Sequence, residues 1–225
     1  MCCKIKIMNI ALFDLDNTLI NGDSDYEWGN FLVENNYVDK EYYQKKNDVF
    51  FEQYRKGTLC PIEFAKFSYE PLAKYDYEFL LDIRKKFFKE KIKPIVHKKA
   101  EDLVKLHKKN NDIIVIVTAT NSFISRLSAD YFKIEDLLAT EPEFKDGKFT
   151  GGLSGEPCFK EGKVNKVKKW MKSNKYTNYE DIYFYTDSHN DIKLLEFCTI
   201  PVAVDPDNIL KEISIKNNWK IISLK

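Results

Sequence analysis

Short apolar runs alternate with helix-like segments through the second half of the chain, and this pattern restricts the fold more than any other feature of the sequence. Residues 112–117 form a nearly continuous apolar run, as in parallel strands that are covered on both faces. Residues 182–185 and 200–204 form further runs, each next to a segment with helical spacing. Repeated strand–helix units predict an α/β fold with a Rossmann-like parallel sheet and right-handed crossovers.

The remaining elements of the sheet region follow from the same criteria. The predicted helices are 97–109, 122–132, 160–173, 190–197 and 208–216. Short strands are predicted at 137–139 and 219–223. Residues 144–150 should form a hairpin, because Asp146 and Gly147 favour a tight turn.

Residues 25–90 differ from this alternating pattern. They contain no β-branched run, and their apolar residues recur every three or four positions. Turn-forming residues near Asn36, Gly57 and Pro71 divide the segment. The pattern predicts an all-helical insert of about four helices directly after the first strand.

Length and composition indicate one large domain, or a core with an insertion. The chain has 225 residues, of which 44% are hydrophobic and 32% charged, so it can build a packed core and a soluble surface. Its formal net charge of +1 gives no reason to expect a nucleic-acid or membrane partner. No apolar stretch approaches the length of a membrane span.

The cysteines and the N-terminus predict a reduced, cytoplasmic protein. The five cysteines are odd in number and form no C-x-x-C pair, which argues against both a zinc site and a disulfide framework. Lys4 and Lys6 interrupt the first apolar run, so we expect no signal peptide.

Asp14 and Asp16 follow the first predicted strand. Side chains two residues apart on an extended segment point the same way, so both carboxyl groups can be presented together where the strand ends. Two close carboxylates repel each other unless a cation lies between them or one keeps its proton. A hard cation such as Mg²⁺ and a nucleophilic carboxylate are both compatible with this pair. The alternative is a strand end with two solvated acids.

A further candidate site follows the predicted strand 112–117. Thr118 and Ala119 come directly after the 112–117 run, where a hydroxyl and backbone N–H groups can bind a phosphate. The alternative there is a routine helix cap from Thr120, Asn121 or Ser122.

Lys163, near the start of the 160–173 helix, can balance the charge of a phosphate and a carboxylate. A solvated side chain is the alternative for this lysine in so lysine-rich a chain.

The segment TDSHND, residues 186–191, follows the predicted strand 182–185. Asp187 stands at the strand end and Asp191 about one helical turn later, so both acids can face a metal held by Asp14. The alternative is a capped helix with acids placed favourably on its dipole. A loop histidine such as His189 is more often a spacer than a ligand.

In its order of motifs the chain resembles the haloacid dehalogenase-like phosphohydrolases, and within them the phosphoserine-phosphatase-like subfamily, called IB. The likeness lies in DLDNTL, VTATNSF, ATEPEF, CFKEGKV and TDSHND. It implies a catalytic core made of residues 1–22 and 91–225, with residues 23–90 as a helical cap of the C1 type. Thr186 departs from the family, in which many members have glycine at this place.

The resemblance also implies roles for individual residues. Asp14 would be the nucleophile that forms an aspartyl-phosphate, and Asp16 the general acid and then the general base. Mg²⁺ would be bound by the Asp14 carboxylate, the Asp16 carbonyl oxygen and Asp187, with Asp191 steering its waters. The expected ligands of the phosphoryl oxygens are Thr118, Ala119, Lys163 and Asn190.

The substrate implied is a small phosphorylated metabolite, hydrolysed by a monomer or weak dimer. Asp23 lies where relatives have an acid for the substrate's amino group, and a gapless alignment puts Lys66 at the arginine that binds its carboxylate. A lysine cannot form the bidentate fork of an arginine. We therefore expect a phosphoserine-phosphatase-like enzyme that acts on a phosphorylated amine or amino alcohol. Histidinol phosphate is one candidate, and phosphoserine is another. A receiver-like phosphoacceptor domain is the alternative from another class of function.

Overall fold

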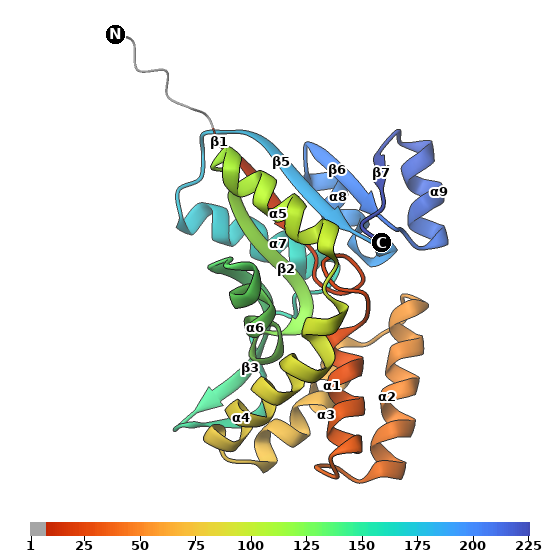
Figure 1. Cartoon of the computed structure of the whole chain (residues 1–225), viewed down its shortest axis with the longest axis vertical. Coiled ribbons are helices and arrows are strands. Elements are labelled where there is room, and N and C mark those ends of the chain that lie inside the picture. The colour runs from red at the N-terminus through yellow and green to blue at the C-terminus, as the bar shows by residue number, and fades with distance from the viewer. Residues whose placement is uncertain (1–7) are drawn as a thin grey trace.

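The computed structural model describes residues 8–225, which form a seven-stranded sheet with helices on its faces and a group of further helices below it in the view of Figure 1. Cys2, Cys3, Lys4 and Lys6 lie outside the described residues. The strands are β1 (Met8–Phe13), β2 (Ile113–Asn121), β3 (Asp136–Lys145), β4 (Lys148–Ser154), β5 (Tyr179–Thr186), β6 (Ile200–Val204) and β7 (Lys220–Ile222).

The strand order is β4-β3-β2-β1-β5-β6-β7, and every pair is parallel except β3 with β4. This confirms the predicted α/β fold. β1 lies at the centre of the sheet, between β2 and β5. The carboxyl ends of these three strands therefore meet at one edge, where ligands bind in sheets of this kind.

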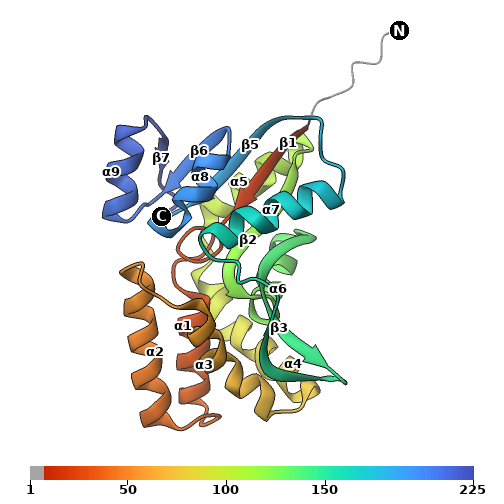
Figure 2. The same cartoon turned by 180° about the vertical axis from the view of Figure 1, so that it is seen from behind.

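Helices cover both faces of the sheet, as the alternation of apolar side chains requires. Ala11 and Phe13 belong to one apolar cluster, and Ile10 and Leu12 belong to a second cluster on the other face. The core helices are α5 (Lys98–Asn110), α6 (Ser122–Phe132), α7 (Glu161–Ser173), α8 (Ile192–Phe197) and α9 (Asn208–Lys216), with a 3-10 turn at His189–Asp191. Figure 1 shows α5 in front of the sheet, and Figure 2 shows α7 on the opposite side.

The insert after β1 is helical, as predicted. It consists of α1 (Ser24–Glu34), α2 (Lys40–Arg55), α3 (Pro61–Lys74) and α4 (Tyr77–Phe87), followed by one π turn (Phe88–Ile92) and one 3-10 turn (Lys93–Ile95).

One expected turn in the insert is wrong. Pro71 lies inside the last turn of α3, where it is buried, and the chain leaves the helix after Lys74. Packing of this buried face offsets the hydrogen bond that proline cannot donate.

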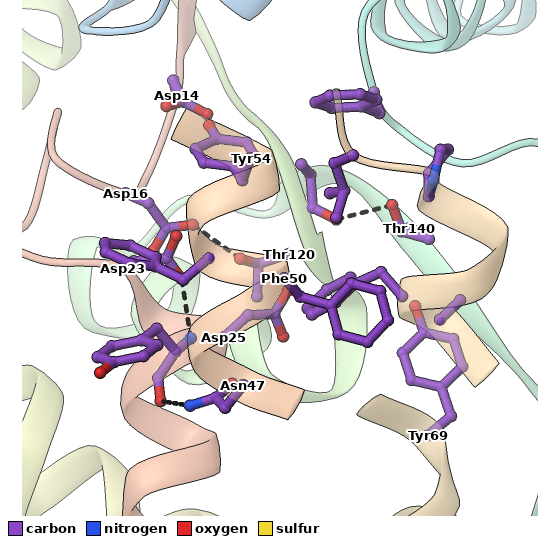
Figure 3. A pocket seen from close by; sticks show the side chains of 18 residues that line it. Asp14, Asp16, Asp23, Asp25, Asn47, Phe50, Tyr54, Tyr69, Thr120 and Thr140 are labelled. Carbon is purple, nitrogen blue, oxygen red and sulfur yellow. Dashed lines mark hydrogen bonds between the residues drawn. The ribbon is translucent and has the colours of Figure 1, made fainter. Parts of the chain in front are cut away.

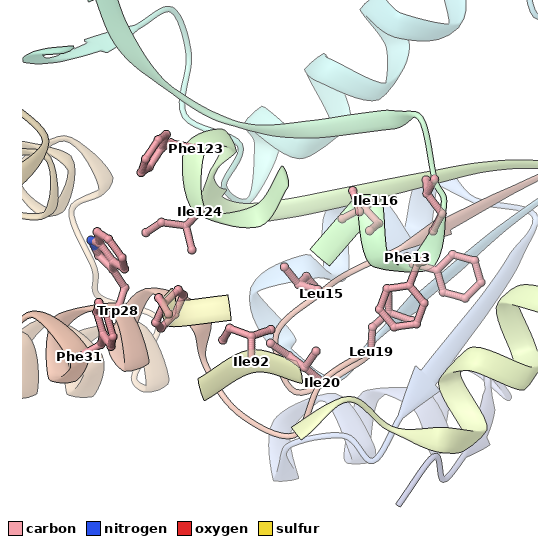
Figure 4. Close-up of a cluster of buried hydrophobic side chains, with 14 of the residues drawn as sticks. Phe13, Leu15, Leu19, Ile20, Trp28, Phe31, Ile92, Ile116, Phe123 and Ile124 are labelled. Carbon is pink, nitrogen blue, oxygen red and sulfur yellow. The ribbon is translucent and has the colours of Figure 1, made fainter. Parts of the chain in front are cut away.

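The insert and the sheet share one apolar cluster. Trp28 and Phe31 from α1 belong to the same cluster as Leu15 and Ile20, which follow β1, and Ile124 of α6 (Figure 4). All five side chains are at most 3% exposed. Burial of this kind stabilises a fold by roughly 1.5–3 kcal/mol per large side chain, so the cluster firmly attaches the root of the insert to the core.

The hairpin predicted at 144–150 is confirmed, with longer arms. β3 and β4 pair from Lys145 and Lys148 outward, and Asp146 and Gly147 in the turn both have positive φ angles. The predicted short strand 137–139 is one part of β3, which pairs with β2 along its first half. No helix within residues 8–225 is both long enough and apolar enough to cross a membrane.

Candidate active site

Asp14 and Asp16 lie together at the carboxyl end of the central strand. The Asp14 N–H donates to the carbonyl of Tyr185 on β5 at 2.9 Å, which continues the sheet by one residue. The chain then turns through Asn17, whose φ of 53° lies in the left-handed region that asparagine tolerates. The Asp16 carboxylate accepts the Ser24 N–H at 2.7 Å, so the loop closes around this acid.

Lys163 is buried and paired, not solvated. Its side chain is 2% exposed, and its Nζ lies 2.8 Å from Asp14 Oδ1 and 2.7 Å from Asp191 Oδ2. The first turn of α7 therefore places one cation between an acid after β1 and an acid after β5. Two buried carboxylates cannot be left without such a partner except at high cost.

Burial dominates the electrostatics of this cluster. It raises the pKa of Asp14 to about 7, although Lys163 acts in the opposite direction, and the nearby Asp191 and Asp16 add to the increase. The pKa of Lys163 is raised despite its burial, because Asp14 and Asp191 both favour its charged form. The lysine therefore remains a cation.

Asp187 and Asp191 differ in their surroundings. Asp191 accepts hydrogen bonds from Lys163 and, at 2.7 Å, from the Thr186 hydroxyl. Thr186, the departure from the family pattern, thus helps to hold Asp191 in place. Asp187 has weaker partners: Thr18 Oγ1 lies 3.4 Å from its carboxylate. Burial raises the pKa of Asp187 well above the ordinary value, and Asp14 and Asp191 raise it further.

The residues predicted to bind Mg²⁺ have suitable chemistry for a hard divalent cation. Asp14, Asp187 and Asp191 present three carboxylates against the charge of Lys163, and every donor is an oxygen atom. Within residues 8–225, however, no three acid, histidine or cysteine side chains are grouped as a metal site. Binding of Mg²⁺ by the Asp14 and Asp187 carboxylates and the Asp16 carbonyl oxygen therefore stays a prediction.

Thr118 and Thr120 both face Asp16. The Thr120 hydroxyl donates to Asp16 Oδ2 at 2.7 Å, and Thr118 Oγ1 lies 3.4 Å from the same oxygen. The helix cap proposed as the alternative also exists, because Asn121 accepts the Ile124 N–H at 3.0 Å. Ala119 lines the adjoining pocket. The segment therefore begins a helix and at the same time presents two hydroxyls to the candidate acid.

Asn190 lies at the contact between the sheet and the insert. Its Nδ2 donates to the carbonyl of Tyr54 at 3.2 Å, while its buried Oδ1 has no hydrogen-bond partner within residues 8–225. His189 is bound to Asp207 through Nδ1 at 2.8 Å. That contact holds the ring of the histidine in place through one of its two nitrogens.

A pocket opens from the candidate acids toward the insert (Figure 3). Asp14 and Asp16 lie at one end of it and Tyr69 at the other. Its wall is acidic and aromatic, and no lysine or arginine of the described chain lines it. The residues of these two classes are Asp14, Asp16, Asp23, Asp25, Tyr26, Phe50, Phe51, Tyr54, Phe64, Tyr69 and Phe159.

Asp23 and Asp25 are two further acids of the pocket wall. Asp23 caps α1 by accepting the Tyr26 N–H at 2.8 Å, and Asp25 accepts from Asn121 Nδ2 at 3.1 Å. Burial raises the pKa of Asp23 to about 7, and Asp16 raises it further. The pKa of Asp25 is raised well above the ordinary value by burial, then by Asp23 and Asp16. A cationic group bound here would relieve the repulsion between these acids and favour their charged forms, so this end of the pocket suits a cation.

The expected position of Lys66 is wrong. Lys66 is exposed on α3, while its neighbour Ala65 faces the pocket. Neither arginine of the insert replaces it, because Arg55 pairs with Glu52 at the surface and Arg84 donates to the carbonyl of Phe123. A helix turns by about 100° per residue, so an alignment error of one or two positions moves a side chain to another face.

Several residues of the site were not predicted. The sequence indicates Thr120 only as a helix cap, although it lies two residues after Thr118 and its side chain therefore points the same way on an extended segment. Asp25 stands two residues after Asp23, a repeat of the spacing between Asp14 and Asp16 that could have drawn attention to it. Nothing in the local sequence indicates Tyr54, since its place depends on how the insert packs on the sheet.

Comparison with known proteins is consistent with this geometry. The family model described as haloacid dehalogenase-like hydrolase matches residues 11–196. A histidinol-phosphatase from Neisseria meningitidis is 36% identical over 220 residues, which are 96% of this chain and 99% of that protein. A phosphoserine phosphatase from Mycobacterium tuberculosis is 25% identical over 223 residues, covering 96% of this chain and 71% of the relative.

A solved structure has the same architecture over nearly its whole length. It is that of a protein of unknown function from Bordetella pertussis, with a TM-score of 0.91 and 37% identity. The match covers 97% of this chain and 100% of the other.

Proposed function

The chain belongs to the haloacid dehalogenase-like hydrolases, and from this premise we propose that it is a Mg²⁺-dependent phosphatase of small phosphorylated amines. The observation that supports the proposal best is the buried ion pair of Asp14 and Lys163 at the carboxyl edge of the sheet. The Asp14 carboxylate lines the pocket beside a second acid, Asp16, and the Lys163 ammonium group lies next to Asp14. Such an arrangement suits the transfer of an anionic group to Asp14.

In the first step an oxygen of Asp14 attacks the phosphorus atom of the substrate. A bond forms between this oxygen and phosphorus, and the bond from phosphorus to the alcohol oxygen breaks. Lys163 stabilises the charge on the phosphoryl oxygens, while Asp16 gives its proton to the leaving alcohol. Thr120 and Ser24 keep the Asp16 carboxyl group in place through their hydrogen bonds of 2.7 Å.

In the second step Asp16, now a carboxylate, accepts a proton from a water molecule that attacks the aspartyl-phosphate. The bond between phosphorus and Asp14 breaks, and inorganic phosphate leaves. Residues 23–90 act as a cap in this proposal, because their helices form the outer wall of the pocket and limit the entry of water.

Asp14, Asp187 and the Asp16 carbonyl oxygen would hold Mg²⁺, which supplies positive charge to the phosphoryl oxygens when bound. Asp191 would hold the water molecules of the ion. We expect Mg²⁺ affinity to fall as the pH decreases from about 8 to 6, because burial raises the pKa of Asp14 to about 7 and a proton then competes with the ion. Titration calorimetry at several pH values measures this dependence, and Asp14→Asn should weaken it.

The metal-free protein should show the opposite dependence in its stability. Between pH 4 and 7 folded Asp14 binds a proton that the unfolded chain does not bind, because its pKa is raised from 3.8 to about 7. The free energy of unfolding must then decrease as the pH rises through this window.

The Mg²⁺ titration has its own contrary outcome. A Mg²⁺ affinity that is the same at pH 6 and pH 8 would contradict the assignment of Asp14 as a ligand.

The pocket supports a substrate that has an amine and a ring but no carboxylate. Asp23 and Asp25 can pair with an ammonium group, and aromatic side chains can pack on a ring or a cation. A carboxylate of the substrate would lie near the acids of the pocket wall, and no lysine or arginine of the described residues lines the pocket to pair with it. Histidinol phosphate fits these conditions, and a named histidinol-phosphatase is 36% identical to the chain.

A substrate panel tests the specificity. We expect kcat/KM for histidinol phosphate to exceed that for phosphoserine by about a hundredfold or more, which corresponds to about 2.7 kcal/mol. Phosphoethanolamine, which has the amine but no ring, should lie between them, and glycerol phosphate should be poor. Asp25→Asn should reduce the preference for amines, while the surface variant Asp102→Asn serves as the control. Equal or better turnover of phosphoserine would refute this choice of substrate.

The alternatives have less support. Phosphoserine is the substrate named for a relative at 25% identity, but its carboxylate would have no cationic partner among the described residues that line the pocket. The receiver-like alternative does not account for the helical insert over Asp14 or for Asp16 beside it. We include a cytoplasmic location in the proposal, because Cys60, Cys158 and Cys198 are unpaired.

A further inference from the structure

Tyr54 brings a hydroxyl group of the insert to the nucleophile. It belongs to the last turn of α2, and its side chain lines the same pocket as Asp14. Figure 3 shows the Tyr54 ring directly beside Asp14, with its hydroxyl toward the carboxylate. This hydroxyl makes no hydrogen bond within residues 8–225, so its proton is available to a ligand.

The backbone around Tyr54 is held by side chains of the core. Its carbonyl accepts from Asn190 Nδ2 at 3.2 Å, and the carbonyl of Gly57 accepts from Lys160 Nζ at 2.7 Å. The Tyr54 carbonyl also accepts the Gly57 N–H at 3.0 Å, so it takes the Asn190 amide on its second lone pair, and the Gly57 carbonyl lies just beyond the end of α2. Two polar contacts therefore fix the end of α2 against the core.

Gly57 makes this close contact possible. Its φ is +67°, and a Cβ atom added there would lie 2.9 Å from Nε2 of His189. His189 in turn is held by Asp207. Any larger residue at position 57 would be strained and would push the end of α2 away from the core. Tyr54 owes its place beside Asp14 to this approach.

The Tyr54 hydroxyl carries a proton at neutral pH, because the ordinary pKa of a phenol is about 10. A neutral phenol is a hydrogen-bond donor, and Asp14, toward which this hydroxyl points, belongs to the core side of the pocket. In the substrate-free protein the Tyr54 hydroxyl has no acceptor among the described residues. An anionic oxygen of a ligand that lies between the insert and Asp14 would accept its hydrogen bond.

We propose that the Tyr54 hydroxyl donates a hydrogen bond to a non-bridging oxygen of the phosphoryl group while that group lies against Asp14. The insert then takes part in the reaction itself and not merely in the choice of substrate. This inference rests on the proposed phosphatase function. No proton is transferred, because the phenol keeps its hydrogen atom throughout.

Tyr54→Phe tests the inference, because it removes the hydroxyl and keeps the ring and the carbonyl that Asn190 binds. We expect kcat/KM to fall about 10- to 100-fold, the effect of one hydrogen bond to a charged group. The loss should be equal for histidinol phosphate and for 4-nitrophenyl phosphate, since both present the same phosphoryl oxygens. The inhibition constant of inorganic phosphate should rise as well. Tyr42→Phe, on an exposed position of the same helix, is the matched control.

Three outcomes would overturn the inference. In the first, Tyr54→Phe has the same kcat/KM as Tyr42→Phe. In the second, the decrease in kcat/KM is confined to histidinol phosphate. In the third, the decrease is confined to substrates with poor leaving groups. The second outcome would make Tyr54 a specificity contact, and the third would place it at the leaving oxygen. Failure of the wild-type chain to hydrolyse any phosphomonoester with Mg²⁺ would instead refute the proposed function, so the two failures are distinguishable.

Discussion

Asp14→Asn is expected to abolish turnover, with kcat lower by roughly 10,000-fold or more. The carboxylate oxygen of Asp14 is the attacking atom in the proposed reaction, and an amide oxygen is far too weak a nucleophile to replace it. The substitution preserves size and shape. Lys163 also keeps its second partner, because Asp191 lies 2.7 Å from its Nζ.

The measurement is the steady-state rate on 4-nitrophenyl phosphate with Mg²⁺ present. Asp102→Asn, which alters an exposed acid of α5, controls for the loss of one surface charge. Circular dichroism confirms that the Asp14 variant is folded. Residual activity within tenfold of the wild type would rule out covalent catalysis at Asp14.

Asp16→Asn should have the second-largest effect and a different kinetic signature. General acid–base catalysis contributes about 100- to 10,000-fold, and the variant loses it in both steps. An aryl phosphate has a good leaving group, so the first step should still proceed on Asp14. The second step should stall, because no carboxylate takes the proton of the attacking water.

Rapid mixing with 4-nitrophenyl phosphate distinguishes the two steps. We expect a burst of nitrophenol that approaches one equivalent per enzyme, followed by a very slow steady rate. Thr120→Val leaves the Asp16 carboxyl group in place and removes its 2.7 Å hydrogen bond, so its effect should be intermediate. A steady rate for Asp16→Asn close to that of the wild type, without a burst, would exclude the role of Asp16.

The strands and the residues at their ends could be predicted from the sequence. The runs before Asp14, Thr118 and Asp187 are short and strongly apolar, as buried parallel strands require, and the polar residue that follows each one marks the active edge. This local signal predicts the strand well, because a short and continuously apolar segment fits few elements other than a buried parallel strand. The hairpin at Asp146 and Gly147 was predictable for a similar reason, since few residues adopt its turn.

The insert shows where such prediction ends. Its helices were recognised from their period, but which face of each helix meets the core depends on packing between segments far apart in the chain. Lys66 and Tyr54 illustrate this, as the first is exposed and the second reaches Asp14. The burial of Lys163 also depends on two acids that are distant in sequence.

The apolar cluster shared by the insert and the sheet has a consequence for recombination among relatives. An exchange of residues 23–90 would replace Trp28 and Phe31 but leave Leu15, Ile20 and Ile124, which pack in the same cluster. A foreign insert would then meet a surface shaped for other side chains, and mismatched cores lose stability. The segment that can be inherited as a unit is therefore larger than residues 23–90, and it includes the loop that follows Asp14.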